Sequence, residues 1–96
     1  PPASPPVRVP FVAIGPGEMC WERQAYQPTV AQCALIALSL GKVFELYDHP
    51  TGAVHEESGC MSWTTHHMGA LEFIVNAAEM PCPASADVTC YCALVG

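Results

Sequence analysis

The sequence predicts an α+β fold: a two-layer β-α-β-β-α-β sandwich in which a four-stranded antiparallel sheet carries two helices on one face and is held by three disulfides. The 96 residues contain six cysteines, an even number typical of a small extracellular domain with a disulfide framework. Apolar residues make up 51% of the chain, which is enough for a packed core. Segments with strand-like and helix-like spacing follow one another in the order that this fold requires.

The chain begins with a proline-rich lead and a strand. Residues 1–6 are mostly proline, so we expect a flexible lead that looks like a processed N-terminus. Residues 7–96 then form a single disulfide-stapled domain. Val7–Ile14 is rich in β-branched residues and predicts the first strand, and Pro10 favours a place at the edge of the sheet.

A capping box starts the first helix. The Thr29 hydroxyl can accept from the amide of Gln32, and the Gln32 side chain can reach back to Thr29. Strong helix formers fill Ala31–Leu40, and Gly41 supplies a left-handed stop. The helix is apolar on nearly every side, so we expect it between the sheet and a second covering layer, with Cys33 bridged near its start.

The middle of the chain predicts a hairpin. Val43–Asp48 and Ala53–Glu57 are strand-like, and residues 49–52, His-Pro-Thr-Gly, suit a type I turn between them. An alternative is that the first helix runs on through Gly41 and includes the first of these strands.

A second helix is predicted after the hairpin. Thr64 or Thr65 can cap it, and Pro81 ends it. Apolar residues recur every three or four positions on one face, with polar residues opposite. The apolar face consists of Met68, Leu71, Val75 and Ala78, and the opposite face of Glu72, Asn76 and Glu79.

Val88–Val95 alternates in the manner of a last strand, with Cys90 and Cys92 on one face. We expect that face to lie under the helices, so that one of the two cysteines could reach Cys33. A direct bond between Cys90 and Cys92 is disfavoured, because Cα atoms two positions apart on a strand are about 6.6–7 Å apart.

Structural disulfides are the favoured interpretation of the cysteines. Zinc sites and redox sites both favour cysteines in the spacing Cys-x-x-Cys, which the chain does not contain, because its closest pair is Cys90-x-Cys92, so we expect no metal and no cofactor. Six cysteines allow 15 pairings, among which the sequence does not choose. The disulfide candidates are Cys20, Cys33, Cys60, Cys82, Cys90 and Cys92.

The charge narrows the choice of partners. The net charge is −6 with only three Lys or Arg, so nucleic acid and anionic membranes are disfavoured. The longest apolar run, Cys33–Leu38, is far shorter than the ~20 residues of a membrane span, so we expect no transmembrane segment.

Each candidate catalytic group is explained more simply by a non-catalytic role. His66 and His67 are adjacent at the predicted helix start, where neighbours diverge by ~100° and cannot easily bind one ion. Glu56 and Glu57 point to opposite faces of a strand, and the pair Glu18 and Glu22 is more simply a solvated surface. We therefore predict that the protein is not an enzyme and has no catalytic residue.

Two tryptophans are candidates for binding a partner. Trp21 follows Cys20 directly, and Trp63 lies three residues after Cys60. Each ring can pack on a disulfide, and each can instead be an exposed anchor for a partner.

The element order and cysteine positions resemble small secreted cysteine-rich fungal proteins, in particular the family with the fold of the smut-virus killer toxin's α subunit. The residues that carry the resemblance are Cys20 before the first helix, Cys33 within it, Cys60 ahead of the second, Cys82 after it, and Cys90 with Cys92 in the final strand. The resemblance implies a compact α/β sandwich, secretion, and action by binding host or competitor molecules without catalysis.

We therefore expect a secreted effector that binds a host or competitor protein or a cell-surface component. The alternatives are a killer-toxin-like cytotoxic or antimicrobial protein and, third, a small hydrolase using histidine and carboxylate groups. The strand near Val7–Ile14 could also pair between copies, so the protein is expected to be a monomer or an edge-paired dimer.

Overall fold

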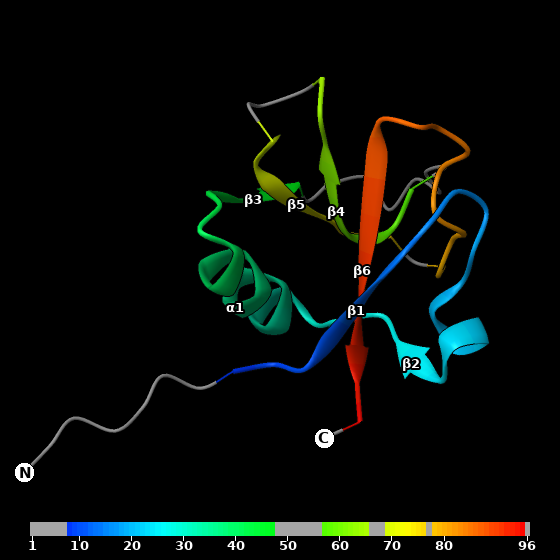
Figure 1. The fold of residues 1–96 in the computed structure, drawn as a ribbon, viewed down its shortest axis with the longest axis horizontal. Coiled ribbons are helices and arrows are strands. Elements are labelled where there is room, and N and C mark those ends of the chain that lie inside the picture. The colour runs from blue at the N-terminus through cyan, green and yellow to red at the C-terminus, as the bar shows by residue number, and fades with distance from the viewer. Residues whose placement is uncertain (1–7, 48–56, 66–68, 77, 96) are drawn as a thin grey trace, which may run out of the picture.

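A mixed β-sheet forms the centre of the structure, with one α-helix on one of its faces (Figure 1). The computed structural model describes residues 8–47, 57–65, 69–76 and 78–95. In this part of the chain the sheet has six strands in the order β1-β6-β4-β5-β3, and β2 also pairs with β6. The elements are β1 (Phe11–Ile14), the 3-10 helix η1 (Cys20–Arg23), β2 (Ala25–Tyr26), α1 (Val30–Leu40), β3 (Phe44–Tyr47), β4 (Gly59–Trp63), β5 (Leu71–Ile74) and β6 (Val88–Leu94). The predicted α+β class with three disulfides is confirmed, whereas the four-stranded antiparallel sheet with two helices is wrong.

The helix α1 forms where its local signals predict it. The Gln32 amide donates to Thr29 Oγ1 at 3.1 Å, and the Thr29 amide donates to Gln32 Oε1 at 2.9 Å. Gly41 ends the helix with a φ of +68°, so the alternative of a helix that continues through it is excluded. Only one side of α1 is buried, and Leu38 on the other side is 68% exposed. Within the described residues, the second covering layer that we expected is therefore not present.

The first arm of the predicted hairpin forms the strand β3, and the partner that the structure describes for it is β5. It pairs in parallel with β5, with Phe44 opposite Leu71 and Tyr47 opposite Ile74. Of the other arm of the predicted hairpin, residues 53–56 lie outside the described residues, and Glu57 is not in a strand.

The predicted second helix is wrong where it can be compared, because Leu71–Ile74 is the strand β5. All four residues of β5 are buried, since the strand lies inside the sheet between β4 and β3. Three of its four residues are apolar and the fourth, Glu72, is buried as well, so the strand shows no alternation of buried and exposed positions, and its apolar spacing resembles a helix face by coincidence. The strand β4 (Gly59–Trp63), which was not predicted, is buried in the same way except at Trp63.

The two faces of the sheet carry separate cores. On the face under α1, Cys33 and Ile36 of the helix pack with Cys60 and Phe73 of the sheet, and Phe11 and Tyr91 join them. On the opposite face, Met61, Ile74, Cys90 and Cys92 pack with Cys20 and Cys82 from the connecting segments. Cys90 and Cys92 therefore share a face, as the alternation predicts, but it is the face away from α1.

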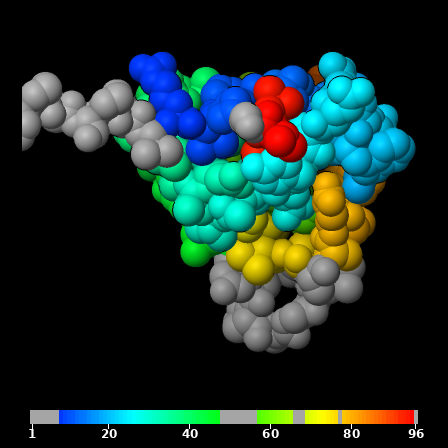
Figure 2. All heavy atoms as spheres, turned by 90° about the horizontal axis from the view of Figure 1, so that it is seen from below, coloured from blue at the N-terminus to red at the C-terminus, as the bar shows by residue number. Residues whose placement is uncertain are grey.

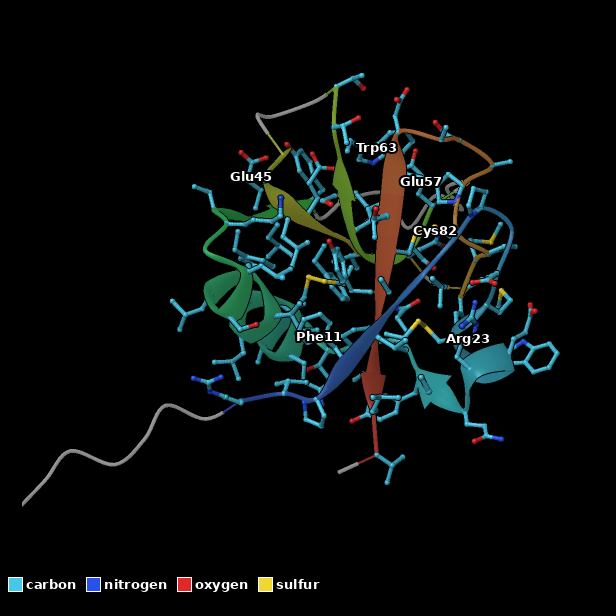
Figure 3. The ribbon with its side chains drawn as sticks, viewed as in Figure 1. Phe11, Arg23, Glu45, Glu57, Trp63 and Cys82 are labelled. Carbon is cyan, nitrogen blue, oxygen red and sulfur yellow. A yellow bond between two sulfur atoms is a disulfide. The ribbon has the colours of Figure 1, made fainter. Side chains whose placement is uncertain are left out.

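Three disulfides tie these layers together (Figure 3). Cys33–Cys60 links α1 to β4, so the predicted link from Cys33 to the last strand is wrong. The last strand instead holds Cys20–Cys92 and Cys82–Cys90, which fasten the segments that cover the other face. The Cα–Cα distances of 5.5–5.9 Å are normal for disulfides. All six cysteines are bonded.

The first strand is shorter than predicted. β1 begins at Phe11, the residues 8–10 before it are not in a strand, and Val7 lies outside the described residues. β1 stands at one end of the row of strands, which confirms the predicted edge position (Figure 1).

Candidate functional site

The most exposed aromatic side chain in the described structure is Trp21, the second residue of η1. Its side chain is 69% exposed, although tryptophan usually buries most of its large apolar surface. The segment of η1 and β2 lies beside the start of β1 and the end of β6 on one face of the molecule, as the cyan, blue and red atoms of Figure 2 show.

A disulfide fixes the position of Trp21. Its neighbour Cys20 is 7% exposed and is bonded to Cys92 in β6, an interior strand of the sheet. Two residues after η1 ends, Ala25 pairs with Leu94 of the same strand. The short helix is therefore attached to β6 at both of its ends.

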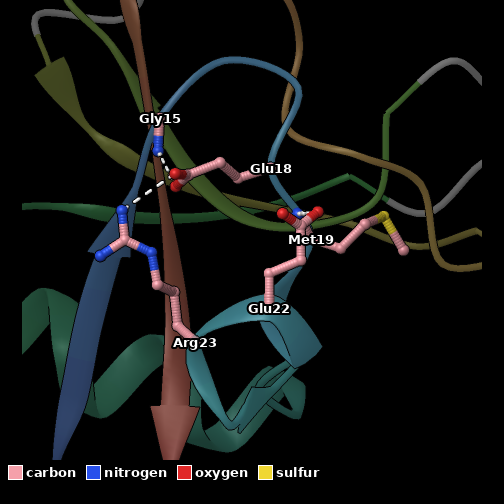
Figure 4. Close-up of polar contacts among 5 residues, drawn as sticks. All are labelled: Gly15, Glu18, Met19, Glu22 and Arg23. Carbon is pink, nitrogen blue, oxygen red and sulfur yellow. Dashed lines mark hydrogen bonds and ion pairs between the residues drawn. The ribbon is translucent and has the colours of Figure 1, made fainter.

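Polar contacts of the turn before η1 add to this attachment (Figure 4). Glu18 Oε1 accepts a hydrogen bond of 2.9 Å from Arg23, and its Oε2 accepts one of 2.9 Å from the Gly15 amide. Glu22 Oε1 accepts from the Met19 amide at 3.1 Å. The hydrogen bond from Arg23, followed by that from Gly15, lowers the pKa of Glu18 below its usual value. Glu18 and Glu22 therefore hold the backbone of the turn.

Trp63, the other tryptophan candidate, is placed differently. It ends β4 opposite Val88, is half-buried, and packs against the core cluster that contains Cys82 and Cys90. The two tryptophans that the sequence treats alike thus differ in exposure, and Trp21 is the one that is open to a partner.

A second polar cluster, which sequence reasoning missed, lies on the sheet face away from α1. Glu45 of β3 is directly opposite Glu72 of β5, and Glu72 is only 6% exposed. The Tyr47 hydroxyl donates a hydrogen bond of 2.7 Å to Glu45 Oε2. This bond, together with partial burial and the charges of Glu45 and Glu72, raises the pKa of Tyr47 to about 12. The sequence had placed Glu72 on the solvent side of a helix.

A groove with a cavity volume of about 570 Å³ opens beside this cluster. The Lys42 ammonium reaches across it and donates to the Gly69 carbonyl at 3.1 Å. A carbon added at Gly69 would lie 3.4 Å from Lys42 Nζ, in ordinary van der Waals contact with it. The full lining is Leu40, Gly41, Lys42, Val43, Glu45, Gly69 and Ala70.

For the remaining candidate catalytic residues, the structure does not describe a site. His66, His67 and Glu56 lie outside the described residues, and Glu57 precedes β4, where its main-chain carbonyl accepts a hydrogen bond of 2.8 Å from the Asn76 side chain. Among the described residues, no three His, Cys, Asp or Glu side chains are grouped closely enough to hold a metal ion. Nor does the described structure contain a helix with the length and apolar character needed to cross a bilayer.

Comparison with known protein families, curated proteins and solved structures finds no match to this chain.

Proposed function

We propose that this chain is a secreted, disulfide-stapled effector that binds a host or competitor molecule and does not catalyse a reaction. The observation that carries the proposal is a tryptophan, Trp21, that is 69% exposed and sits directly beside a buried disulfide.

Trp21 has enough open surface to anchor a partner. Burying a tryptophan removes ~150–250 Å² from water. At ~25 cal/mol per Å², covering the exposed part of Trp21 would contribute roughly 3–4 kcal/mol, the range of a binding hot spot. Arg23, another residue type enriched at hot spots, lies in the same short helix.

The anchor is also held in place before binding. Cys20–Cys92, the pairing of β2 with β6 and the bonds of Glu18 and Glu22 all restrain η1. A side chain on a restrained backbone loses less conformational freedom when a partner covers it. This favours recognition by a preformed surface.

The disulfides support the extracellular part of the proposal. Three bridges in a chain of 96 residues are typical of proteins that work outside the reducing cytosol, where small domains gain stability from cross-links. The −6 charge suits a protein that remains soluble there.

A pair of matched variants tests the proposal. Trp21→Ala removes the anchor, and Leu38→Ala removes an apolar side chain of nearly equal exposure from the outer side of α1. The oxidised proteins are infiltrated into leaf tissue and, labelled, applied to plant and fungal cells. We expect Trp21→Ala to lose surface binding and the tissue response by at least about thirtyfold, the smallest loss expected at a hot spot, while Leu38→Ala retains both. Full activity of Trp21→Ala would contradict the proposal.

The killer-toxin-like alternative has one observation in its favour. The helix α1 exposes Leu38 on its outer side and Val30 and Leu40 at its two ends, apolar side chains that could contact a competing cell. In a growth-inhibition assay this alternative predicts that Leu38→Ala, and not Trp21→Ala, reduces killing. Absence of killing at micromolar dose would exclude it.

A further inference from the structure

The outer edge of β1 presents main-chain groups with no partner in the described structure. The Leu94 amide donates to the Pro10 carbonyl at 2.9 Å, so Pro10 and Leu94 form a hydrogen-bonded pair. In an antiparallel ladder such pairs alternate, and the next ones are Val12 with Cys92 and Ile14 with Cys90. The N–H and C=O groups of the intervening residues, Phe11 and Ala13, therefore point away from β6.

The open part of the edge ends at Gly15. This is the next residue after Ala13 whose main-chain groups point away from β6. Its amide donates to Glu18 Oε2 at 2.9 Å, and its carbonyl accepts from the Glu18 amide at 3.2 Å. Glu18 thus closes the edge at Gly15. Four main-chain groups, two on Phe11 and two on Ala13, remain open.

Pro10, which precedes β1, does not block its outer edge. A proline often blocks an edge strand because it lacks an N–H. In this strand the missing N–H of Pro10 would face Leu94 on the inner side of the ladder. The outer side of β1 therefore keeps its donors.

We propose that two copies of this chain pair through these edges, antiparallel about a two-fold axis at Val12. In that register Phe11 of each copy lies opposite Ala13 of the other, and the four open groups on each side all find partners. The two Val12 side chains meet as a β-branched cross-strand pair, and each Phe11 ring lies beside the small Ala13. The two sheets become one continuous sheet.

The distribution of charge favours pairing through β1. The helix α1 makes its main contacts with β3 and β5, so it does not cover the outer edge of β1 in the row of strands. The other edge strand, β3, carries Glu45, whereas β1 carries no charge. Residues 8–40 hold two arginines and two glutamates, while residues 41–96 hold one lysine and seven acidic residues. Pairing through β1 therefore joins the electrically neutral segments and keeps Glu45 on the far edge of each sheet.

Amide hydrogen exchange tests the pairing in the full chain. Because the overlap is short, we expect dimerisation between about 10 µM and about 1 mM, seen as a doubling of mass by sedimentation. Over this range the Phe11 and Ala13 amides should slow by at least about tenfold, while Val12 and Ile14, already bonded to β6, should not change.

A matched pair of variants identifies the edge. Ala13→Pro removes an outward N–H and leaves the ladder with β6 intact, so it should remain monomeric, whereas Ala13→Ser should dimerise like the parent. Should Ala13→Pro fail to fold, Ala13→Lys replaces it: like charges across the axis should weaken the dimer at low salt, and about 1 M salt should restore it. A parent chain that is monomeric at about 1 mM, or a dimer that persists in Ala13→Pro, overturns the proposal. Protection of the two amides only by an added strand peptide would assign the edge to a different partner and would overturn it as well.

Discussion

Tyr47 donates a hydrogen bond of 2.7 Å to Glu45, two residues earlier on the same strand, at a point where Glu45 also faces the buried Glu72. Two carboxylates on neighbouring strands repel each other unless a donor or a proton compensates them. The phenol of Tyr47 supplies such a donor, so it is held in its protonated form.

The first prediction concerns this phenol. The pKa of Tyr47 is raised to about 12 from the usual value of 10.0, so its contribution to stability is complete below pH 10 and is lost as the pH rises through 12. An absorbance titration of the native protein should show one tyrosine ionising late, and Tyr47→Phe should remove that step. The control, Tyr26→Phe, should leave it in place. A late step that survives in Tyr47→Phe would assign it to another tyrosine.

The second prediction concerns Glu18 and Arg23. The lowered pKa of Glu18 means that its contribution to stability is present above the usual carboxyl pKa of 4.5 and is lost as the pH falls through the lower pKa of the folded state. Glu18→Gln should therefore lower the urea midpoint at pH 7, and the difference from the parent should shrink at acid pH. Both side chains are open to solvent, so we expect a modest effect that high salt reduces further. An undiminished difference at pH 2 would show that the ion pair is not its cause.

The third prediction ranks the disulfides. The spans of Cys20–Cys92, Cys33–Cys60 and Cys82–Cys90 are 72, 27 and 8 residues. Loop-closure entropy then gives contributions of roughly 4, 3.5 and 2.5 kcal/mol to the free energy of unfolding. Replacing each pair with alanines and measuring urea unfolding tests this order. If loss of the shortest loop were the most damaging, packing around the sulfurs would outweigh chain entropy.

The fourth prediction concerns Gly59 at the start of β4. Its φ is +89°, and a Cβ there would lie 3.0 Å from Gln27 Cγ, whose side chain accepts a hydrogen bond of 3.0 Å from Ser58. Gly59→Ala should lower the free energy of unfolding by about 1–3 kcal/mol, because it adds backbone strain and displaces Gln27. The control is Gly15→Ala, where nothing lies within 4 Å of the added carbon. Equal stability of the two variants would contradict this account.

Elements defined by local chemistry were predictable from the sequence. The Thr29 and Gln32 capping box and Gly41 fix the ends of α1 through contacts within a few residues. The alternation of β6 likewise follows from its own residues, and it places Cys90 and Cys92 on one face. Which face lies under the helix depends on partners elsewhere in the chain, and that inference failed.

Elements defined by distant contacts were not predictable. The spacing of the apolar residues Leu71, Phe73 and Ile74 suits a helix face or an interior strand equally, and only the place of this segment between β3 and β4 decides between the two. The candidate site likewise has features that the sequence predicts and features that it does not. Its cysteines and Trp21 stand out by residue type, but the exposure of Trp21 and the burial of Glu72 depend on the tertiary packing.

The bridge from Cys20 to Cys92 encloses both other bridges within its span. A protease that cuts any single peptide bond inside this span therefore leaves one covalently connected molecule, with the Trp21 turn still attached to β6. In fluids rich in digestive enzymes, a clipped copy stays in one piece and needs a second cut before any fragment can diffuse away.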